Sequence, residues 1–206
     1  WNCLGWIDPD EMLMSSDVDI IYIALPIGIH FESSMRSLIA GKHVWCEKPI
    51  TCNHEDTKTL IEFARKNKKM LAEGFMYLYH PQLTRVKNFI QSGNNNHIRS
   101  IVCRFGIPNL KNPGFRLDPN LGGGAFWDVG SYTICASLAI FPKEDVRVIF
   151  SEIVHNNNSS VDLTNYSWNN YWNAKTAITY DWQNPEGFIL IGYEDPYSNS
   201  VKLRVL

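Results

Sequence analysis

The stretch Gly41-Lys42-His43-Val44-Trp45-Cys46-Glu47-Lys48-Pro49-Ile50 decides the fold of this 206-residue chain. Residues 42–46 predict a short, mostly buried strand, because His-Val-Trp-Cys suits a parallel strand. The strand ends before Pro49, which has no N–H to donate to a sheet. Glu47 and Lys48 therefore follow the carboxyl end of a strand, where ligands bind in open α/β sheets. The alternative interpretation is a surface Glu-Lys pair.

The segments on both sides of this strand form a β-α-β-α-β pattern, which predicts half of a doubly wound parallel sheet. The predicted elements are a helix over residues 10–16, a strand buried on both faces over 20–25, a helix over 31–40 that ends at Gly41, a helix over 53–67 capped by Asn53, and a strand over 70–75. The residues expected on the inner sides of the two longer helices are Met35, Leu38 and Ile39, and Leu60, Ile61 and Ala64.

The second half of the chain has a different character. It predicts a helix from Pro81 to Gln91, a strand over 98–107, an active-site-type loop over 108–120, a helix over 125–140, and strands over 146–154, 161–168, 174–182, 187–193 and 201–206. We therefore predict an α/β fold class: a partial Rossmann-type parallel sheet, residues 1–76, lacking its Gly-rich first unit, followed by an α+β domain with a mainly antiparallel open sheet, residues 77–206.

Composition excludes several classes of protein. The chain is 45% hydrophobic and 19% charged with a net charge of -2, so no basic field points to nucleic acid or to a membrane surface. The longest apolar run, residues 20–26, is too short to span a bilayer. Five cysteines without a Cys-x-x-Cys pair argue against a disulfide framework or a metal site and favour reduced thiols in the cytoplasm. We interpret Cys46 as a buried small hydrophobe and not as a nucleophile.

A glycine cluster and two polar residues mark a second candidate site. Gly122-Gly123-Gly124 lacks the spacing of a phosphate-binding loop and indicates a close backbone approach at a helix start. Asp128 and Tyr132 are four residues apart, so a helix would present both on one face. A nearby cation helps a phenol to lose its proton, and Lys48 is a candidate for that cation. An exposed acid and a core tyrosine are the alternative.

Several short motifs follow one another along residues 17–136. They are Ala24-Leu25-Pro26 with His30, residues 40–44 with Glu47-Lys48-Pro49, residues 73–77 with His80-Pro81-Gln82, and Phe115-Arg116-Leu117-Asp118-Pro119 before residues 122–125 and 128–132. Together they resemble the Gfo/Idh/MocA family of NAD(P)-dependent oxidoreductases. Tyr132, where many members have histidine, is similar to the branch with glucose–fructose oxidoreductase, dihydrodiol dehydrogenase and NADP-dependent xylose dehydrogenase.

The resemblance implies hydride transfer between NAD or NADP and a sugar-like or dihydrodiol carbinol, with the small-molecule substrate bound by the second domain. It implies that Lys48 hydrogen-bonds the reacting hydroxyl, that Tyr132 is the general acid/base, and that Asp128 positions substrate or tyrosine. The residues implied on the nicotinamide-ribose side are Leu25, Pro26, His30, Glu47, Lys48 and Pro49. It also implies a homo-oligomer formed through the C-terminal sheet.

Two departures from the family pattern leave other functions open. The chain has no G-x-G-x-x-G fingerprint, and Trp1 and Leu206 fall inside the family's domains, so we expect a sequence truncated at both ends. Leu78-Tyr79 stands where an arginine often precedes an aromatic residue. The alternatives are a non-catalytic member that binds a nucleotide or protein partner, and a structural subunit of an oligomer.

Overall fold

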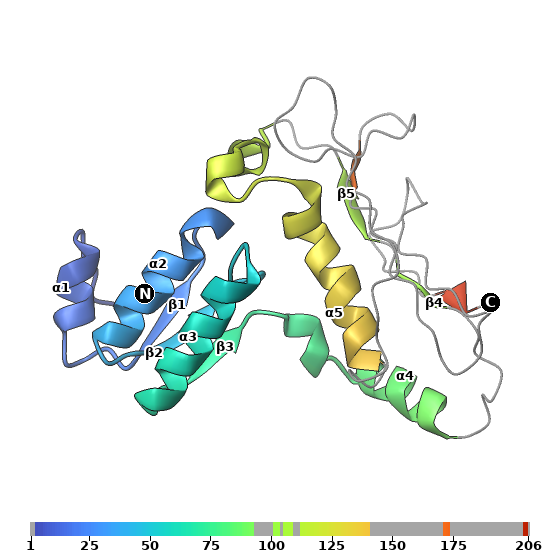
Figure 1. Ribbon diagram of the computed structural model, residues 1–206, viewed down its shortest axis with the longest axis horizontal. Coiled ribbons are helices and arrows are strands. Elements are labelled where there is room, and N and C mark those ends of the chain that lie inside the picture. The colour runs from blue at the N-terminus through green and yellow to red at the C-terminus, as the bar shows by residue number, and fades with distance from the viewer. Residues whose placement is uncertain are drawn as a thin grey trace. The chain divides into compact units, whose positions relative to one another are not determined.

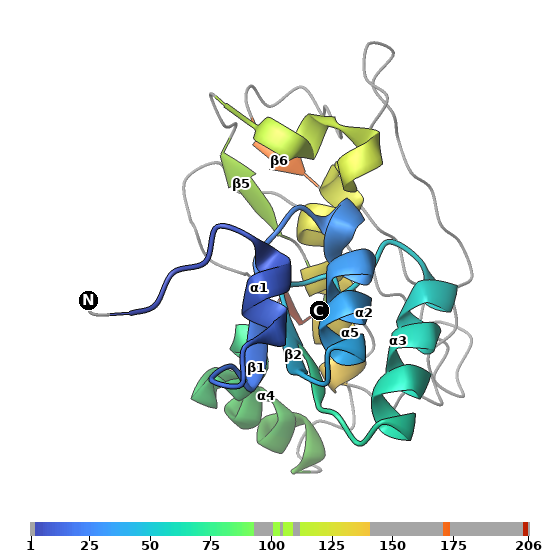
Figure 2. The same cartoon turned by 90° about the vertical axis from the view of Figure 1, so that its left-hand side faces the viewer.

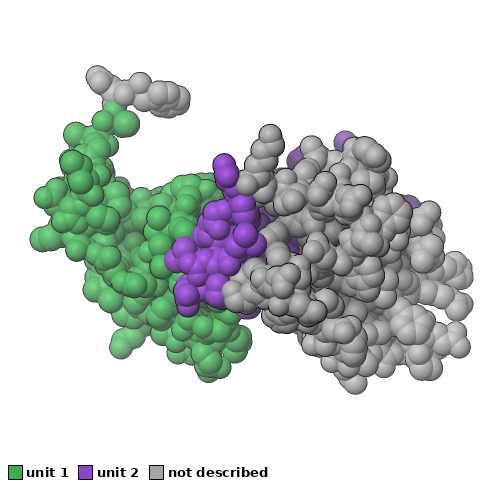
Figure 3. Space-filling view, turned by 90° about the horizontal axis from the view of Figure 1, so that it is seen from above, with its two compact units in different colours: residues 1–74 green, residues 75–206 purple. Residues whose placement is uncertain are grey.

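The computed structural model describes residues 3–92, 101–103, 105–108, 112–140, 171–173 and 204–205. The chain divides into two compact units, Trp1–Gly74 and Phe75–Leu206 (Figure 3). The division falls directly after the last strand of the first unit. Among the described residues, no helix has both the length and the apolar character needed to cross a bilayer.

A three-stranded parallel sheet forms the centre of the first unit. Strands β1 (Ile20–Ile23), β2 (His43–Cys46) and β3 (Leu71–Glu73) lie in the order β1-β2-β3. Helices α2 (His30–Ile39) and α3 (His54–Lys66) connect them and lie side by side against the sheet (Figure 1). The predicted β-α-β-α-β order is therefore confirmed, with each strand slightly shorter than predicted.

The hydrophobic core of this unit occupies one face of the sheet. It contains residues of β1, of β2 and the loop after it, and of three helices, and Leu71 of β3 packs against it: Leu13, Ile21, Ile23, Leu38, Val44, Cys46, Ile50, Leu60 and Ala64. The prediction that the first strand is buried on both faces is wrong, because Ile20 and Tyr22 are 61% and 54% exposed. All the helices that contribute to this core pack on the opposite face from these two side chains.

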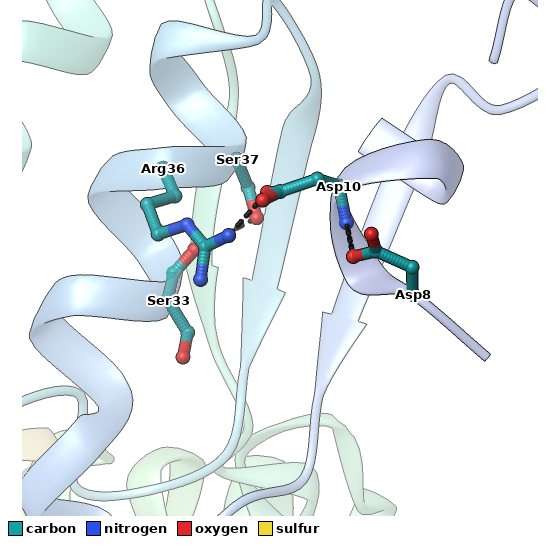
Figure 4. Close-up of polar contacts among 5 residues, drawn as sticks. All are labelled: Asp8, Asp10, Ser33, Arg36 and Ser37. Atoms are coloured by element: carbon teal, nitrogen blue, oxygen red, sulfur yellow. Dashed lines mark hydrogen bonds and ion pairs between the residues drawn. The ribbon is translucent and has the colours of Figure 1, made fainter. Parts of the chain in front are cut away.

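The helix ends follow from local side-chain chemistry. The Asn53 side chain accepts a hydrogen bond from the backbone N–H of Asp56 at 2.8 Å and caps α3, as predicted. Gly41 has φ +75°, the left-handed conformation expected of a glycine that ends a helix. Helix α1 (Pro9–Met14), labelled in Figure 2, is joined to α2 by an ion pair between Asp10 and Arg36 (Figure 4).

One helix side differs from the prediction. Leu38 is buried and Met35 packs partly against the core, but Ile39 is 66% exposed. The buried side of α2 instead includes Ser34 and Ser37. Small hydroxyl side chains let the helix approach the sheet, which hydrophobicity alone did not predict. In α3, Leu60 and Ala64 are buried as predicted and Ile61 is half-buried.

The second unit combines helices with short antiparallel strand pairs. Its helices include η2 (Met76–Tyr79), α4 (Pro81–Gln91) and α5 (Ser131–Ile140). Strand β4 (Ile101–Val102) pairs with β7 (Arg204–Val205), and β5 (Gly106–Pro108) pairs with β6 (Tyr171–Asn173), both antiparallel. The predicted antiparallel pairing is therefore confirmed for the strands that the structure describes.

The predicted strand boundaries in this unit need correction. The single strand predicted over 98–107 is two strands, because β4 and β5 pair with different partners. Strand β6 falls between two predicted strands, where we expected a turn. The strands predicted over 146–154, 161–168, 174–182 and 187–193 lie outside the described residues.

The segment before α5 is more regular than predicted. The expected loop over 108–120 contains two short 3-10 helices, η3 (Gly114–Leu117) and η4 (Pro119–Leu121). Pro119 suits the first position of η4, and the Asp118 side chain accepts from the N–H of Asn120 at 2.9 Å. The helix predicted over 125–140 begins with a π-helical turn, η5 (Phe126–Gly130), a feature common at functional sites.

Candidate active site

The carboxyl edge of the parallel sheet carries most of the residues predicted to face the cofactor. Leu25 and Pro26 follow β1, and Glu47 and Lys48 follow β2. Glu47 and Lys48 are half-buried and Leu25 is 48% exposed. The Lys48–Pro49 peptide bond is cis. This edge is where open α/β sheets bind their ligands, so these side chains are placed for contact with a bound molecule.

His30 joins the two loops of this edge. Its ring is 1% exposed, with Nδ1 2.8 Å from the Pro49 carbonyl oxygen and Nε2 2.8 Å from the Leu25 carbonyl oxygen. Both ring nitrogens are therefore engaged inside the first unit. In this geometry His30 shapes the ligand edge by holding the loops after β1 and β2 together.

The Glu47 carboxylate is held by two hydrogen bonds, and Gly74 after β3 leaves room for it. The Tyr22 hydroxyl of β1 donates to Glu47 Oε1 at 2.5 Å, and the Lys48 N–H donates to Oε2 at 3.3 Å. After β3, a Cβ on Gly74 would lie 3.3 Å from Glu47 Cα and 3.4 Å from Cδ. The hydrogen bond to Glu47 raises the pKa of Tyr22. A fixed carboxylate is a hydrogen-bond acceptor that suits the hydroxyls of a ribose, so this edge fits a dinucleotide.

A second carboxylate lies beneath the same loop. Glu73 Oε1 accepts from the Ile50 N–H at 2.8 Å. Burial raises the pKa of Glu73, while that hydrogen bond and the charges of His30 and Lys48 act in the opposite direction. Glu73 thus supports the chain directly after the Glu47-Lys48-Pro49 motif.

In the second unit, Asp128 forms an ion pair that sequence reasoning missed. Arg116 Nε donates to Asp128 Oδ2 at 2.7 Å, and the two side chains are 29% and 10% exposed. Arg116 belongs to the motif Phe115-Arg116-Leu117-Asp118-Pro119, but we gave it no role in the sequence analysis. The sequence did contain a signal for this pair: an arginine comes shortly before the glycine cluster and a helix that carries an acidic residue. A buried carboxylate needs a partner, and this arginine is a candidate for it.

The glycine cluster makes this ion pair possible. A Cβ on Gly123 would lie only 2.6 Å from the carbonyl oxygen of Arg116. The Gly124 N–H donates to that same oxygen at 3.0 Å, and the Gly123 N–H donates to Asp118 O at 2.9 Å. The predicted role of the glycines, close backbone approach at a helix start, is confirmed.

Tyr132 lies in an aromatic cluster. Its ring centroid is 5.1 Å from Phe105, 5.5 Å from Phe75 and 6.0 Å from Tyr77, and its hydroxyl is 3.8 Å from Met76 Sδ. Burial raises the pKa of Tyr77, so that phenol stays protonated at neutral pH.

The predicted catalytic residues belong to both units. Lys48 is in the first unit, whereas Asp128 and Tyr132 are in the second. Within the units, the structure brings together Glu47 with Tyr22 and Asp128 with Arg116. Among the described residues, no group of three His, Cys, Asp or Glu side chains gathers into a metal-binding cluster.

Comparison with known families decides what this arrangement belongs to. Residues 2–75 match the oxidoreductase family GFO_IDH_MocA, NAD-binding Rossmann fold, and residues 83–190 match the GFO/IDH/MocA C-terminal domain. The chain belongs to the Gfo/Idh/MocA family. The predicted family and Rossmann-type α/β fold class are thus confirmed, and the first unit carries the family's NAD-binding fold.

The relatives of this Gfo/Idh/MocA chain include enzymes of sugar chemistry. The dTDP-3,4-didehydro-2,6-dideoxy-alpha-D-glucose 3-reductase of Streptomyces violaceoruber is 34% identical over 163 residues, 79% of this chain and 47% of that protein. The D-xylose 1-dehydrogenase (NADP(+)) 2 of Haloferax volcanii is 31% identical over 130 residues, 62% of this chain and 39% of that protein.

A solved structure has the same fold. The crystal structure of a 3-ketoreductase from Actinomadura kijaniata in complex with NADP and TDP-benzene superposes with a TM-score of 0.78 at 29% identity, covering 96% of this chain and 57% of that chain. The chain spans about half the length of the curated relatives it matches.

Proposed function

We propose that this protein is an NAD(P)-dependent oxidoreductase that transfers a hydride between nicotinamide and a carbinol carbon of a sugar, with a nucleotide-linked keto sugar as the first substrate to test. The observation that carries the proposal is the position of Glu47 and Lys48 at the carboxyl edge of the sheet in a chain of this family. In this proposal the first unit holds the cofactor and the second binds the substrate.

The cofactor side of the proposed site consists of residues of the first unit. The held carboxylate of Glu47 accepts hydrogen bonds from ribose hydroxyls, and Leu25, Pro26 and Pro49 line the nicotinamide side. His30 keeps the two loops in place through the Leu25 and Pro49 carbonyl oxygens. The nicotinamide supplies the hydride acceptor, or the donor in the reverse direction, when the cofactor is bound.

The substrate side uses a cation, a phenol and a carboxylate. Lys48 donates a hydrogen bond to the reacting oxygen and stabilises negative charge that develops on it. In the oxidative direction Tyr132 takes the hydroxyl proton while the carbinol carbon loses its hydride and becomes a carbonyl carbon; in reduction Tyr132 returns that proton. Asp128, held by Arg116, positions the substrate or the tyrosine.

The Actinomadura 3-ketoreductase supports these assignments. Variants of that enzyme in which one tyrosine is replaced by phenylalanine, or one lysine by alanine or glutamate, have been crystallised with TDP-benzene and NADP. That lysine and that tyrosine are separated by the same number of residues as Lys48 and Tyr132. The spacing, together with the match to both family domains, favours Lys48 and Tyr132 as a pair.

A single substitution tests the proposed function. The full-length protein is assayed with NADPH and NADH against a dTDP-linked 3-keto sugar, and in the reverse direction against D-xylose. Lys48→Met is expected to lower kcat by about 10²- to 10³-fold. The matched control is Lys58→Met, which replaces an exposed lysine of α3 in the same unit and leaves kcat unchanged. Equal turnover in both variants would contradict the role of Lys48.

The same assay separates the proposal from its alternative. A non-catalytic family member would bind NADH or NADPH but would not turn over any substrate of the panel. We also propose reduced thiols in a cytoplasmic protein, supported by five cysteines without a Cys-x-x-Cys pair, and association of copies through the C-terminal sheet. A monomer in light scattering would exclude that association.

A further inference from the structure

Tyr22 stands out because its ring lies outside the core while its hydroxyl makes a short hydrogen bond. The side chain is 54% exposed and lies on the sheet face opposite the hydrophobic core, but Tyr22 Oη is 2.5 Å from Glu47 Oε1. The bond connects the carboxylate after β2 to the neighbouring strand β1. Burial of the ring therefore does not explain why a hydroxyl stands at this position.

The position of the Tyr22 ring is itself fixed. Tyr22 and Trp45 are direct partners in the parallel pairing of β1 and β2. Their ring centroids are 5.3 Å apart at an interplanar angle of 63°, an edge-to-face contact. The phenol is thus held by the neighbouring strand before it reaches Glu47.

The carboxylate that receives this bond is also held at its other oxygen, which accepts from the Lys48 N–H at 3.3 Å. Gly74 leaves room for it, because a Cβ at that position would lie 3.4 Å from Glu47 Cδ. Removing the Tyr22 hydroxyl would therefore release one of the two hydrogen bonds and keep the other. A carboxylate that is fixed before the ligand arrives binds more tightly, because less side-chain entropy is lost on binding.

We propose that Tyr22 is a positioning residue for the cofactor: its hydroxyl holds the Glu47 carboxylate at the sheet edge in the orientation that accepts hydrogen bonds from the cofactor ribose. This inference rests on the proposed function, because it needs a nicotinamide dinucleotide at the edge. Tyr22 acts through Glu47 and takes no part in the chemical step.

Cofactor binding tests the inference without knowledge of the substrate. In the full-length protein, NADPH and NADH are titrated and nicotinamide fluorescence is recorded. Tyr22→Phe is expected to raise the Kd of the preferred cofactor by about 5- to 20-fold, with the melting temperature of the protein unchanged. The control is Tyr79→Phe, which removes a hydroxyl from a side chain that is 86% exposed and leaves the Kd unchanged.

A double variant shows whether Tyr22 acts through Glu47. If it does, Tyr22→Phe combined with Glu47→Gln raises the Kd no further than Glu47→Gln alone. The pKa of the Tyr22 phenol gives a second test that needs no cofactor. It is measured by ultraviolet titration, as the difference between the wild-type protein and Tyr22→Phe. Glu47→Gln is expected to lower that pKa, because the carboxylate bonded to the phenolic hydroxyl raises it.

The possible outcomes separate this inference from the proposed function. No binding of either cofactor to the wild-type protein would overturn the proposed function and this inference with it. Binding by the wild-type protein with an unchanged Kd in Tyr22→Phe would overturn the inference alone. Additive losses in the double variant would also overturn it, because they would mean that Tyr22 acts independently of Glu47.

Discussion

Cys46 illustrates at the residue scale how burial separates a reactive position from an inert one. It is adjacent to Glu47 and Lys48 at the candidate site, yet its side chain is 0% exposed and belongs to the hydrophobic core. Burial raises the pKa of the Cys46 thiol to about 12. Since the thiolate is the nucleophile, this cysteine is unsuited to covalent chemistry at neutral pH.

Thiol labelling checks this conclusion. With a pKa near 12, only about one Cys46 thiol in ten thousand is ionised at a pH of about 8. Iodoacetamide is therefore expected to modify exposed Cys3 and to leave Cys46 unmodified in the folded protein, as read by peptide mass spectrometry. The denatured chain, in which both cysteines react, is the control. Equal rates for Cys3 and Cys46 in the folded protein would contradict the burial argument.

The sequence predicted residue types at this scale better than residue contacts. Glu47 and Lys48 were placed correctly at a strand end, because a proline marks that end. The hydrogen bonds from Tyr22 to Glu47 and from His30 to Pro49 were not predicted, since they connect residues 25 and 19 positions apart in the sequence. Arg116 was missed for the same reason: its partner lies twelve residues further along the chain.

At the element scale, the Arg116–Asp128 ion pair joins η3 to the π-helical turn η5. Arg116→Met leaves the Asp128 carboxylate, 10% exposed, without its guanidinium partner. We expect the second unit to lose about 1–3 kcal/mol of unfolding free energy in denaturant titration, a range reduced because Arg116 is itself 29% exposed.

A matched arginine and a double variant make this prediction specific. Arg85→Met removes an exposed arginine of α4 in the same unit and is expected to change the unfolding free energy by less than about 0.5 kcal/mol. Arg116→Met combined with Asp128→Asn is expected to cost less than the two single losses together, because the double variant removes the buried charge together with its guanidinium partner. Equal losses for Arg116→Met and Arg85→Met would show that the pair adds nothing to stability.

The sequence predicted the elements of the first unit well and those before α5 less well. Hydrophobic runs, the Asn53 cap and Gly41 are local signals, and they located the strands and helices. The π-helical turn and the two 3-10 helices depend on the approach of Arg116 to the glycines, which is a contact between segments. Local patterns therefore could not predict them.

At the scale of the whole molecule, the chain combines an NAD-binding Rossmann domain with the family's C-terminal domain. The family was predictable because its motifs recur in one order along the chain, each with a physical role at a strand end, a turn or a helix start. The substrate was not, because the motifs specify the chemistry of hydride transfer and leave open which sugar presents the carbinol.

The central claim is hydride transfer between nicotinamide and a sugar carbon, and isotope transfer tests it most directly. NADPH and NADH deuterated at nicotinamide C4 are incubated with the full-length protein and a dTDP-linked 3-keto sugar, and the product is analysed by mass spectrometry and NMR. Hydride transfer gives a product with deuterium on the new carbinol carbon, and Lys48→Met is expected to lose that product. A wild-type protein that binds the cofactor but forms no deuterated product would contradict it.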